Sequence, residues 1–185
     1  MVVFFRRPLH HFFREHGMRK RAFTFLIIGL VWSLCAVGSA QQQAKASITI
    51  EGLDGNKLTF TVEQLRQMPQ QSVALANPDH RTAEIYEGVL LRDLLAKLDT
   101  AIGKKVHADD MRNYVEVSGR DGYRVVFALA ELDPSFQDND VLVAISNEGK
   151  PLDDELGPIR VIAPQDKRHG RSVRMVTTIT LRRAP

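Results

Sequence analysis

The chain has 185 residues, of which 44% are apolar, 25 are Lys or Arg, 22 are Asp or Glu and one is a cysteine. This composition indicates one ordinary globular domain and excludes a disordered chain, a collagen-like or coiled-coil fibre and a disulfide scaffold. The net charge of +3 is expected of proteins that bind nucleic acid or anionic membranes, provided that the basic residues lie in the folded domain.

The first 40 residues are typical of a secretory signal peptide instead. A basic triplet at residues 19–21 is followed by sixteen almost wholly apolar residues, 22–37, and then by small residues ending at Ala40. Basic, apolar and small-residue regions in this order direct export and end in a cleavage site. We expect cleavage after Ala40, because an uncleaved membrane anchor needs about 20 apolar residues. Met18 is the expected true start of translation.

Cleavage changes the charge of the protein. Residues 1–40 contain six basic residues and one acidic residue, so the remaining chain has 19 Lys and Arg against 21 Asp and Glu, a formal charge of −2. Cys35 is removed as well, which excludes thiol nucleophiles and thiolate metal sites. We therefore expect a periplasmic or secreted protein that binds neither nucleic acid nor, after cleavage, a membrane.

Residues 41–47 form a polar linker, and the predicted domain covers residues 48–185. Segments with alternating or continuous apolar residues predict β-structure along this domain. They lie at residues 48–53, 58–62, 72–76, 113–118, 123–127, 141–146, 158–163 and 173–181. The first two flank an Asp-Gly-Asn turn, which predicts a β-hairpin.

Leucines at the spacing of one helix face predict the clearest helix of the chain at residues 88–98. Shorter helices are expected at residues 61–68, where Pro69 ends the pattern, and at residues 128–132. Residues 77–79 have the composition of a loop. The prediction is a single α+β domain with a mixed, mainly antiparallel β-sheet and a few short helices.

The three histidines that follow the signal peptide, His80, His107 and His169, are isolated and lack the spacing of metal ligands. Asp79 with His80 and Asp166 with His169 occupy two loops, which would have to converge to bind a metal. We expect solvated loop residues instead, and therefore no metal site. The sequence contains no G-x-S-x-G elbow for a serine nucleophile, and we assign no catalytic residue.

A basic stretch at residues 167–174 is the most informative part of the chain. It reads Lys-Arg-His-Gly-Arg-Ser-Val-Arg and places positive side chains, a glycine and a hydroxyl on a loop that enters a strand. This composition suits the binding of a phosphate or another oxyanion. The alternative is a solvated basic turn at the start of an edge strand.

From the Gly-Val-Leu-Leu segment onward, the chain resembles the molybdopterin-binding domain of the sulfite oxidase group and the small exported proteins classed with it. The family pattern has a Gly-Val-x-Leu-x-x-Leu-Leu helix, an Asp-Gly-Tyr turn, an Asn-Gly-x-Pro-Leu type of turn, a Gly-x-Pro-x-Arg strand and a Gly-x-x-Val-Lys entry to the last strand. These motifs match residues 88–95, 121–123, 147–152, 157–160 and 170–174, in the same order. The resemblance implies the α+β fold of that domain, with molybdopterin as its cofactor.

The resemblance also implies ligand-binding residues. The last motif supplies contacts to the pterin phosphate in the family, so Arg171, Ser172 and Arg174 are the principal candidates, with Arg174 in the place of a lysine. His169 lies in the same basic stretch. The weaker candidates are Arg160, Tyr123, Asn77 and His80. In the alternative interpretation, Arg160 pairs with an acid across the sheet and Tyr123 packs.

One departure from the family bears on activity. Enzymes of the family hold molybdenum through a cysteine in a Cys-x-Gly-Asn setting, and the matching residues 74–77 here are Ala-Leu-Ala-Asn. Ala74 thus occupies the position of the metal ligand. Without that thiolate the standard molybdenum centre cannot form, so we expect no sulfite oxidase activity.

The resulting hypothesis is an exported, non-catalytic protein that binds a small anionic ligand or a partner protein. Two alternatives stay open. One is a molybdopterin-dependent oxidoreductase with atypical metal ligation, in which Asn77 or His80 lies near the metal. The other is an accessory subunit of a periplasmic complex, which would use a sheet edge or the exposed face of the helix at residues 90–98.

Overall fold

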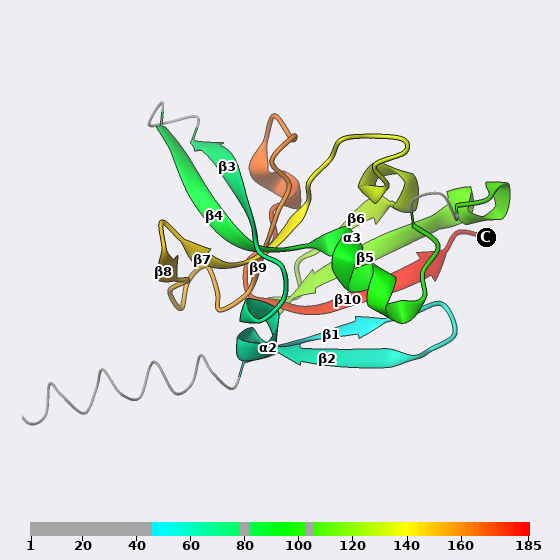
Figure 1. Ribbon diagram of the computed structural model, residues 1–185, viewed down its shortest axis with the longest axis horizontal. Coiled ribbons are helices and arrows are strands. Elements are labelled where there is room, and N and C mark those ends of the chain that lie inside the picture. Colours follow the sequence, from blue (N-terminus) through cyan, green and yellow to red (C-terminus); the bar gives the residue numbers. More distant parts are fainter. Residues whose placement is uncertain (1–45, 78–81, 103–105) are drawn as a thin grey trace, which may run out of the picture. The chain divides into compact units, whose positions relative to one another are not determined.

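The domain begins with a hairpin of β1 (Ser47–Glu51) and β2 (Lys57–Thr61), as the alternating apolar residues predict. Figure 1 shows this hairpin in the computed structural model. Ile48 and Ile50 of β1 are fully buried, because alternate side chains of a strand point to the same face. Gly55 makes the turn with a φ of 81°, a left-handed conformation that favours glycine.

The structure describes residues 46–77, 82–102 and 106–185. The predicted signal peptide and most of the predicted linker lie outside these residues, as do Met18 and Cys35. None of the helices in the described part of the chain is long and apolar enough to cross a membrane.

A short helix, α2 (Val62–Arg66), follows the hairpin where the sequence predicts one. Its N-cap is Thr61, whose hydroxyl accepts a hydrogen bond from the Gln64 N–H at 3.2 Å. The Gln64 side chain accepts one from the Thr61 N–H at 2.9 Å. This reciprocal capping satisfies two N–H groups that the start of a helix otherwise leaves unpaired. Val62 and Leu65 are buried in the main core.

The described strands form two sheets, which we name A and B (Figure 1). Sheet A has the order β2-β1-β10-β5-β6, and its further strands are β5 (Asn113–Gly119), β6 (Arg124–Ala128) and β10 (Val176–Arg183). Sheet B has the order β3-β4-β7-β8, and β9 also pairs with β7. Its strands are β3 (Gln71–Asn77), β4 (Thr82–Leu90), β7 (Leu142–Asn147), β8 (Lys150–Pro151) and β9 (Arg160–Ile162).

Among the described strands, only β1 and β10 pair in parallel, and the other pairings are antiparallel. The helical segments of the described residues are short. They are α2, α3 (Leu91–Leu95) and the 3₁₀ helices η1 (Ala96–Leu98), η3 (Ala108–Arg112), η4 (Leu129–Leu132) and η5 (His169–Arg171). The predicted α+β class with a mixed, mainly antiparallel sheet is therefore confirmed.

The predicted helix at residues 88–98 begins three residues later than expected. Strand β4 continues through Leu90, and α3 starts at Leu91. Gly88 explains the difference, since a Cβ built on it would lie 2.1 Å from the Val143 carbonyl oxygen of β7. The glycine is required for close contact between two strands, and Leu90 pairs with Leu142 of β7.

The last strand also differs from its prediction. It was expected from residue 173, but β10 begins at Val176. Val173 uses its carbonyl to accept from the Val161 N–H at 2.9 Å, and Met175 has a φ of 48°, which breaks the extended backbone. The sequence gives no sign of η3 or η5, whose polar residues show no helical periodicity.

Two apolar clusters are buried among the described residues of the domain. The larger one takes side chains from both sheets and from α3, and it forms the main core. The smaller one lies on sheet B and comprises Leu75, Tyr86, Leu90, Leu142, Ala144, Leu152 and Ile162. Arg160 precedes Ile162 by two residues in β9, so its side chain shares the sheet face of this smaller cluster.

Candidate functional site

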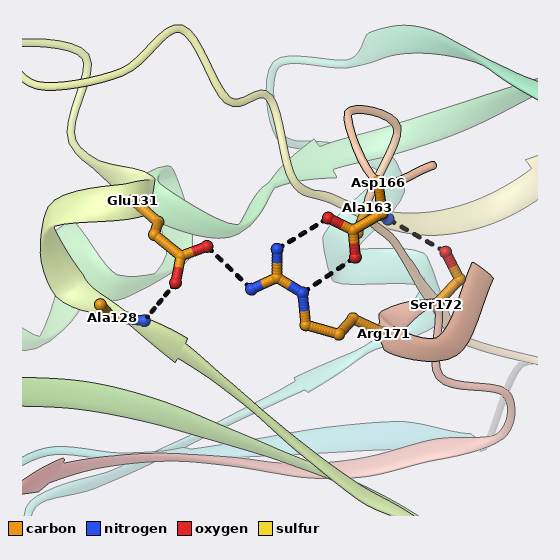
Figure 2. A network of polar contacts seen from close by, with 6 residues as sticks. All are labelled: Ala128, Glu131, Ala163, Asp166, Arg171 and Ser172. Carbon is orange, nitrogen blue, oxygen red and sulfur yellow. Dashed lines mark hydrogen bonds and ion pairs between the residues drawn. The ribbon is translucent and has the colours of Figure 1, made fainter. Parts of the chain in front are cut away.

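Arg171, the first of the principal ligand candidates, is held by two carboxylates of the chain itself (Figure 2). Its Nε donates to Asp166 Oδ2 at 2.9 Å, and its Nη2 donates to Asp166 Oδ1 at 2.7 Å. Its Nη1 donates to Glu131 Oε2 at 2.8 Å. The two parallel bonds to Asp166 have the bidentate geometry that a guanidinium favours. We name these three residues the Arg171 network.

The Arg171 network joins segments that are distant in the sequence. Glu131 belongs to η4, and its other carboxylate oxygen accepts from the Ala128 N–H at 3.0 Å. The guanidinium of Arg171 lies 4.6 Å from the centroid of the Phe127 ring in β6. The hydrogen bonds to Asp166 raise the pKa of Arg171 above its ordinary value. All three guanidinium nitrogens thus donate hydrogen bonds to carboxylates of the domain itself. Arg171 therefore connects η5 to the end of β6.

Ser172 and His169 support the same loop. The Ser172 Oγ accepts from the Ala163 N–H at 3.1 Å, and the residue is buried (Figure 2). The Ser172 N–H donates to the His169 carbonyl at 3.0 Å, which closes η5. The side chain of His169 is half-buried. These contacts hold the loop against β9.

Tyr123 also contacts this loop. It follows the turn at Gly122, whose φ is 84°, and its N–H donates to Asp121 Oδ1 at 2.9 Å. The Tyr123 hydroxyl donates to the Gly170 carbonyl at 2.7 Å, although half of the side chain is exposed. Tyr123 therefore lies beside the basic stretch, as a binding role would require, but its hydroxyl positions η5.

Among the candidates whose side chains are described, Arg160 has a buried group without a hydrogen-bond partner in the described part of the chain. Its side chain is almost fully buried, and its Nη1 donates to the Tyr86 hydroxyl at 2.6 Å. The Tyr86 hydroxyl donates in turn to Glu84 Oε2 at 2.7 Å, and Asn147 Nδ2 donates to the same oxygen at 3.3 Å. We name these four residues the Arg160 cluster. Arg160 reaches the acid across the sheet only through Tyr86, and its guanidinium lies 5.0 Å from the Tyr86 ring centroid.

The Nε of Arg160 is buried and has no hydrogen-bond partner among the described residues. A buried donor without a partner is rare and destabilises the fold. Burial lowers the pKa of Arg160, and the nearby charge of Arg174 lowers it further. Burial raises the pKa of Tyr86, as does its hydrogen bond to Glu84. Arg174 itself is exposed and pairs with Glu155 at 3.2 Å.

The remaining candidates lie around β3. Asn77 is the last residue of β3 and pairs with Thr82, while His80 is outside the described residues. Ala74, in the position of the family's cysteine, is exposed and pairs with Ile85. The next pair, Val73 with Tyr86, points to the other face of the sheet. A side chain at position 74 therefore faces away from Tyr86 and Arg160.

Sequence reasoning missed the partners that define both groups. Asp166 and Glu131 were not connected with Arg171, although Asp166 lies in the same loop as Arg171. Tyr86 and Glu84 carried no signal beyond their alternation in a strand. Within the described ranges, no group of three or more His, Cys, Asp and Glu residues is placed to hold a metal ion.

The sequence profile of the family described as the oxidoreductase molybdopterin binding domain matches residues 36–185. The chain belongs to this family. The resemblance that the five motifs predict is thus confirmed. A search among curated proteins gives no match.

A solved structure shows the same fold. The sulfane dehydrogenase SoxCD from Paracoccus pantotrophus is similar to this chain with a TM-score of 0.57 and 20% sequence identity. The similarity covers 75% of this chain but only 38% of the SoxCD chain. At this identity the comparison establishes the fold of the domain alone.

The described residues do not fit molybdopterin bound in the way that the resemblance implies. The metal would need a thiolate, and Ala74 offers a methyl group on the sheet face opposite to Arg160. The phosphate would need free donors, but Arg171 directs its nitrogens to Asp166 and Glu131. Ser172 is buried against Ala163. The direct ligand roles of Arg171 and Ser172 stay predictions, and the geometry gives both residues a structural role.

Proposed function

We propose that this chain is an exported member of the molybdopterin-binding domain family that binds a small oxyanion at the Arg160 cluster and performs no molybdenum chemistry. The observation that carries the proposal is the buried Nε of Arg160, a charged donor without a partner among the residues that the structure describes. Natural proteins keep such groups chiefly where a ligand, a water or an ion satisfies them.

The electrostatics of the Arg160 cluster support an anionic ligand. A buried guanidinium is stable only when its charge and its donors are compensated. Glu84 compensates Arg160 from a distance, through the Tyr86 hydroxyl, while Arg174 adds a second positive charge. An oxyanion at Nε would satisfy the free donor and offset both positive charges.

The ligand is expected to be small. A guanidinium binds the two-oxygen edge of sulfate, sulfite, phosphate or a carboxylate equally well in geometry. The Nε of Arg160 has no contact with solvent, so side chains that cover it must move to admit the ligand. A compact tetrahedral oxyanion requires less movement than a large cofactor.

Export is the second part of the proposal, and the sequence of residues 19–40 supports it. Its test is the N-terminal sequence of the protein recovered outside the cytoplasm, which should begin at Gln41. Recovery of the intact chain only from the cytoplasm would refute export and would leave the proposal of an oxyanion site unaffected.

Calorimetric titration of the purified protein with sulfate, and separately with phosphate, tests the binding site. Chloride at equal ionic strength is the control for general screening. We expect saturable heat with at least one oxyanion, and its loss in the Arg160→Lys variant, which keeps the charge but not the planar fork. Arg182→Met, an exposed arginine of sheet A, is the matched control and should bind as the native chain does.

Two results would overturn the proposal. One is the absence of binding of every oxyanion tested to the purified protein. Circular dichroism shows in each case that the protein and its variants are correctly folded. The other is stoichiometric molybdenum in protein purified from its native host, which would restore the oxidoreductase interpretation.

A further inference from the structure

Strand β3 forms an edge of sheet B whose outer side has no strand partner among the described elements. It pairs with β4 over seven consecutive positions, from Gln71 with Gly88 to Asn77 with Thr82, without a bulge. An edge strand presents a row of free N–H and C=O groups to any other extended segment. The length and regularity of β3 make this row a continuous template.

The other edges of the two sheets carry the features that discourage pairing, and β3 does not. Strand β2 begins with Lys57 and β6 begins with Arg124, while β8 has two residues and β9, which among the described strands pairs only with β7, has three. Charges on an edge and very short edge strands are the usual protection against pairing between molecules. The sequence of β3, Gln-Ser-Val-Ala-Leu-Ala-Asn, contains neither a charged residue nor a proline.

The order of residue types in β3 is the same in both directions. Around Ala74, the strand has an aliphatic residue on each side, Val73 and Leu75, then a small residue, Ser72 and Ala76, and then an amide. An antiparallel copy centred on Ala74 would therefore place aliphatic residues opposite aliphatic residues and small residues opposite small ones. Such matched cross-strand pairs stabilise a sheet. A two-fold dimer requires a self-complementary interface, in which the same surface of each copy contacts the other.

The two faces of β3 suit this arrangement. Val73 and Leu75 contact the smaller apolar cluster, so the copy's aliphatic residues would extend it. On the other face, Ala74 and Ala76 are exposed beside Ala83 and Ile85 of β4, which also lie at the surface. Side chains on a sheet face stand roughly perpendicular to the sheet, so they leave the outer backbone edge of β3 open to a second strand.

From these observations we infer that two copies of this chain associate through antiparallel pairing of their β3 strands, with the two-fold axis at Ala74. Sheet B then continues across the axis from one copy to the other. The interface rests mainly on backbone hydrogen bonds and a few small side chains, so the dimer is weak and depends on concentration. This inference is independent of the oxyanion site.

Sedimentation equilibrium of the processed protein over a dilution series is the first test, and it should show a reversible monomer–dimer equilibrium. In Ala74→Lys, two like charges meet directly across the axis, which should raise the dissociation constant by roughly tenfold or more. Ala83→Lys places the same charge on the same face of the sheet, one strand inward, and is the matched control that should dimerise nearly as the native chain does.

Charge pairing makes the test specific to Ala74. Ala74→Lys and Ala74→Glu should each dimerise more weakly than the native chain, and an equal mixture of the two should dimerise more tightly than either variant alone. Circular dichroism of each variant shows that the fold is intact. A native protein that stays monomeric at every concentration overturns the inference, and so does a dimer that Ala74→Lys leaves unchanged.

Discussion

The guanidinium of Arg171 lies over the ring of Phe127 while it binds the carboxylate of Asp166 through two parallel hydrogen bonds. The aromatic face and the bidentate carboxylate fix both the position and the plane of this side chain. Arg171 therefore holds in place the loop that leads into β10. Its loss is expected to affect the stability of the domain more than the binding of a ligand.

Replacing Arg171 with Met should lower the free energy of unfolding by about 2 kcal/mol, because Glu131 and Asp166 would face each other without a cation. Arg171 is one-third exposed, so the loss is smaller than for a fully buried pair. Urea denaturation measures it. Arg174→Met is the control, since its exposed pair with Glu155 is worth about 0.5 kcal/mol or less. Equal losses in the two variants would contradict the structural role of the Arg171 network.

Tyr86→Phe should destabilise the domain by about 2 kcal/mol, because it leaves the buried Nη1 of Arg160 without an acceptor and removes a donor to Glu84. Tyr123→Phe loses a single bond to the Gly170 carbonyl at the surface and should cost less than about 1 kcal/mol. Thermal and urea unfolding of the two variants measure the difference. A smaller effect at Tyr86 than at Tyr123 would mean that the Arg160 cluster is not a stabilising unit.

The raised pKa of Tyr86 predicts a loss of stability at alkaline pH. Burial and Glu84 keep the folded phenol protonated above the ordinary tyrosine value of 10.0, while the unfolded phenol ionises near it. Above pH 10 the folded state then holds more protons than the unfolded state. The contribution of Tyr86 to the free energy of unfolding is therefore fully present below pH 10 and falls as the pH rises from there towards the folded pKa. The tyrosinate absorbance should show a phenol that titrates late. That phase should be missing in Tyr86→Phe, and its persistence there would assign it to another tyrosine.

Gly88→Ala should lower the free energy of unfolding by about 3 kcal/mol or more, because the new Cβ would lie 2.1 Å from the Val143 oxygen and 2.8 Å from the Ala144 Cα. Gly170→Ala is the natural control: no atom lies within 4 Å of a Cβ there, and the change should stay within about 0.5 kcal/mol. Chemical denaturation of both variants provides the comparison. A stable Gly88→Ala protein would show that β4 and β7 can separate at this point.

The sequence predicts best what depends on neighbouring residues. The hairpin of β1 and β2, the capped helix α2 and the β5–β6 turn are local, and the structure has all three. The start of α3 was placed too early because the leucine spacing at residues 90–98 is the same whether Leu90 ends a strand or begins a helix. Its pairing with Leu142 decides the matter, and no local pattern reveals that partner.

The candidate site shows the same division. Residue type and motif identify Arg160 and Arg171 as functional candidates, but their roles depend on partners supplied by the fold. Asp166 and Glu131 approach Arg171 from a loop and from η4, and Tyr86 approaches Arg160 from a strand in which it lies 74 residues earlier in the sequence. The sequence shows which residues can bind an anion. Only the structure shows which of them are already paired with a carboxylate of the same chain.

The central position of β10 in sheet A bears on when this domain can fold. Strand β10 is the last strand of the fold, yet it lies between β1, which is the first, and β5. A growing chain that lacks β10 therefore holds two separate hairpins with no strand to join them, and the main core lacks Val176, Ile179 and Leu181. Folding of sheet A must wait until the ribosome has released this segment, so β1 and β5 stay without their shared partner throughout synthesis.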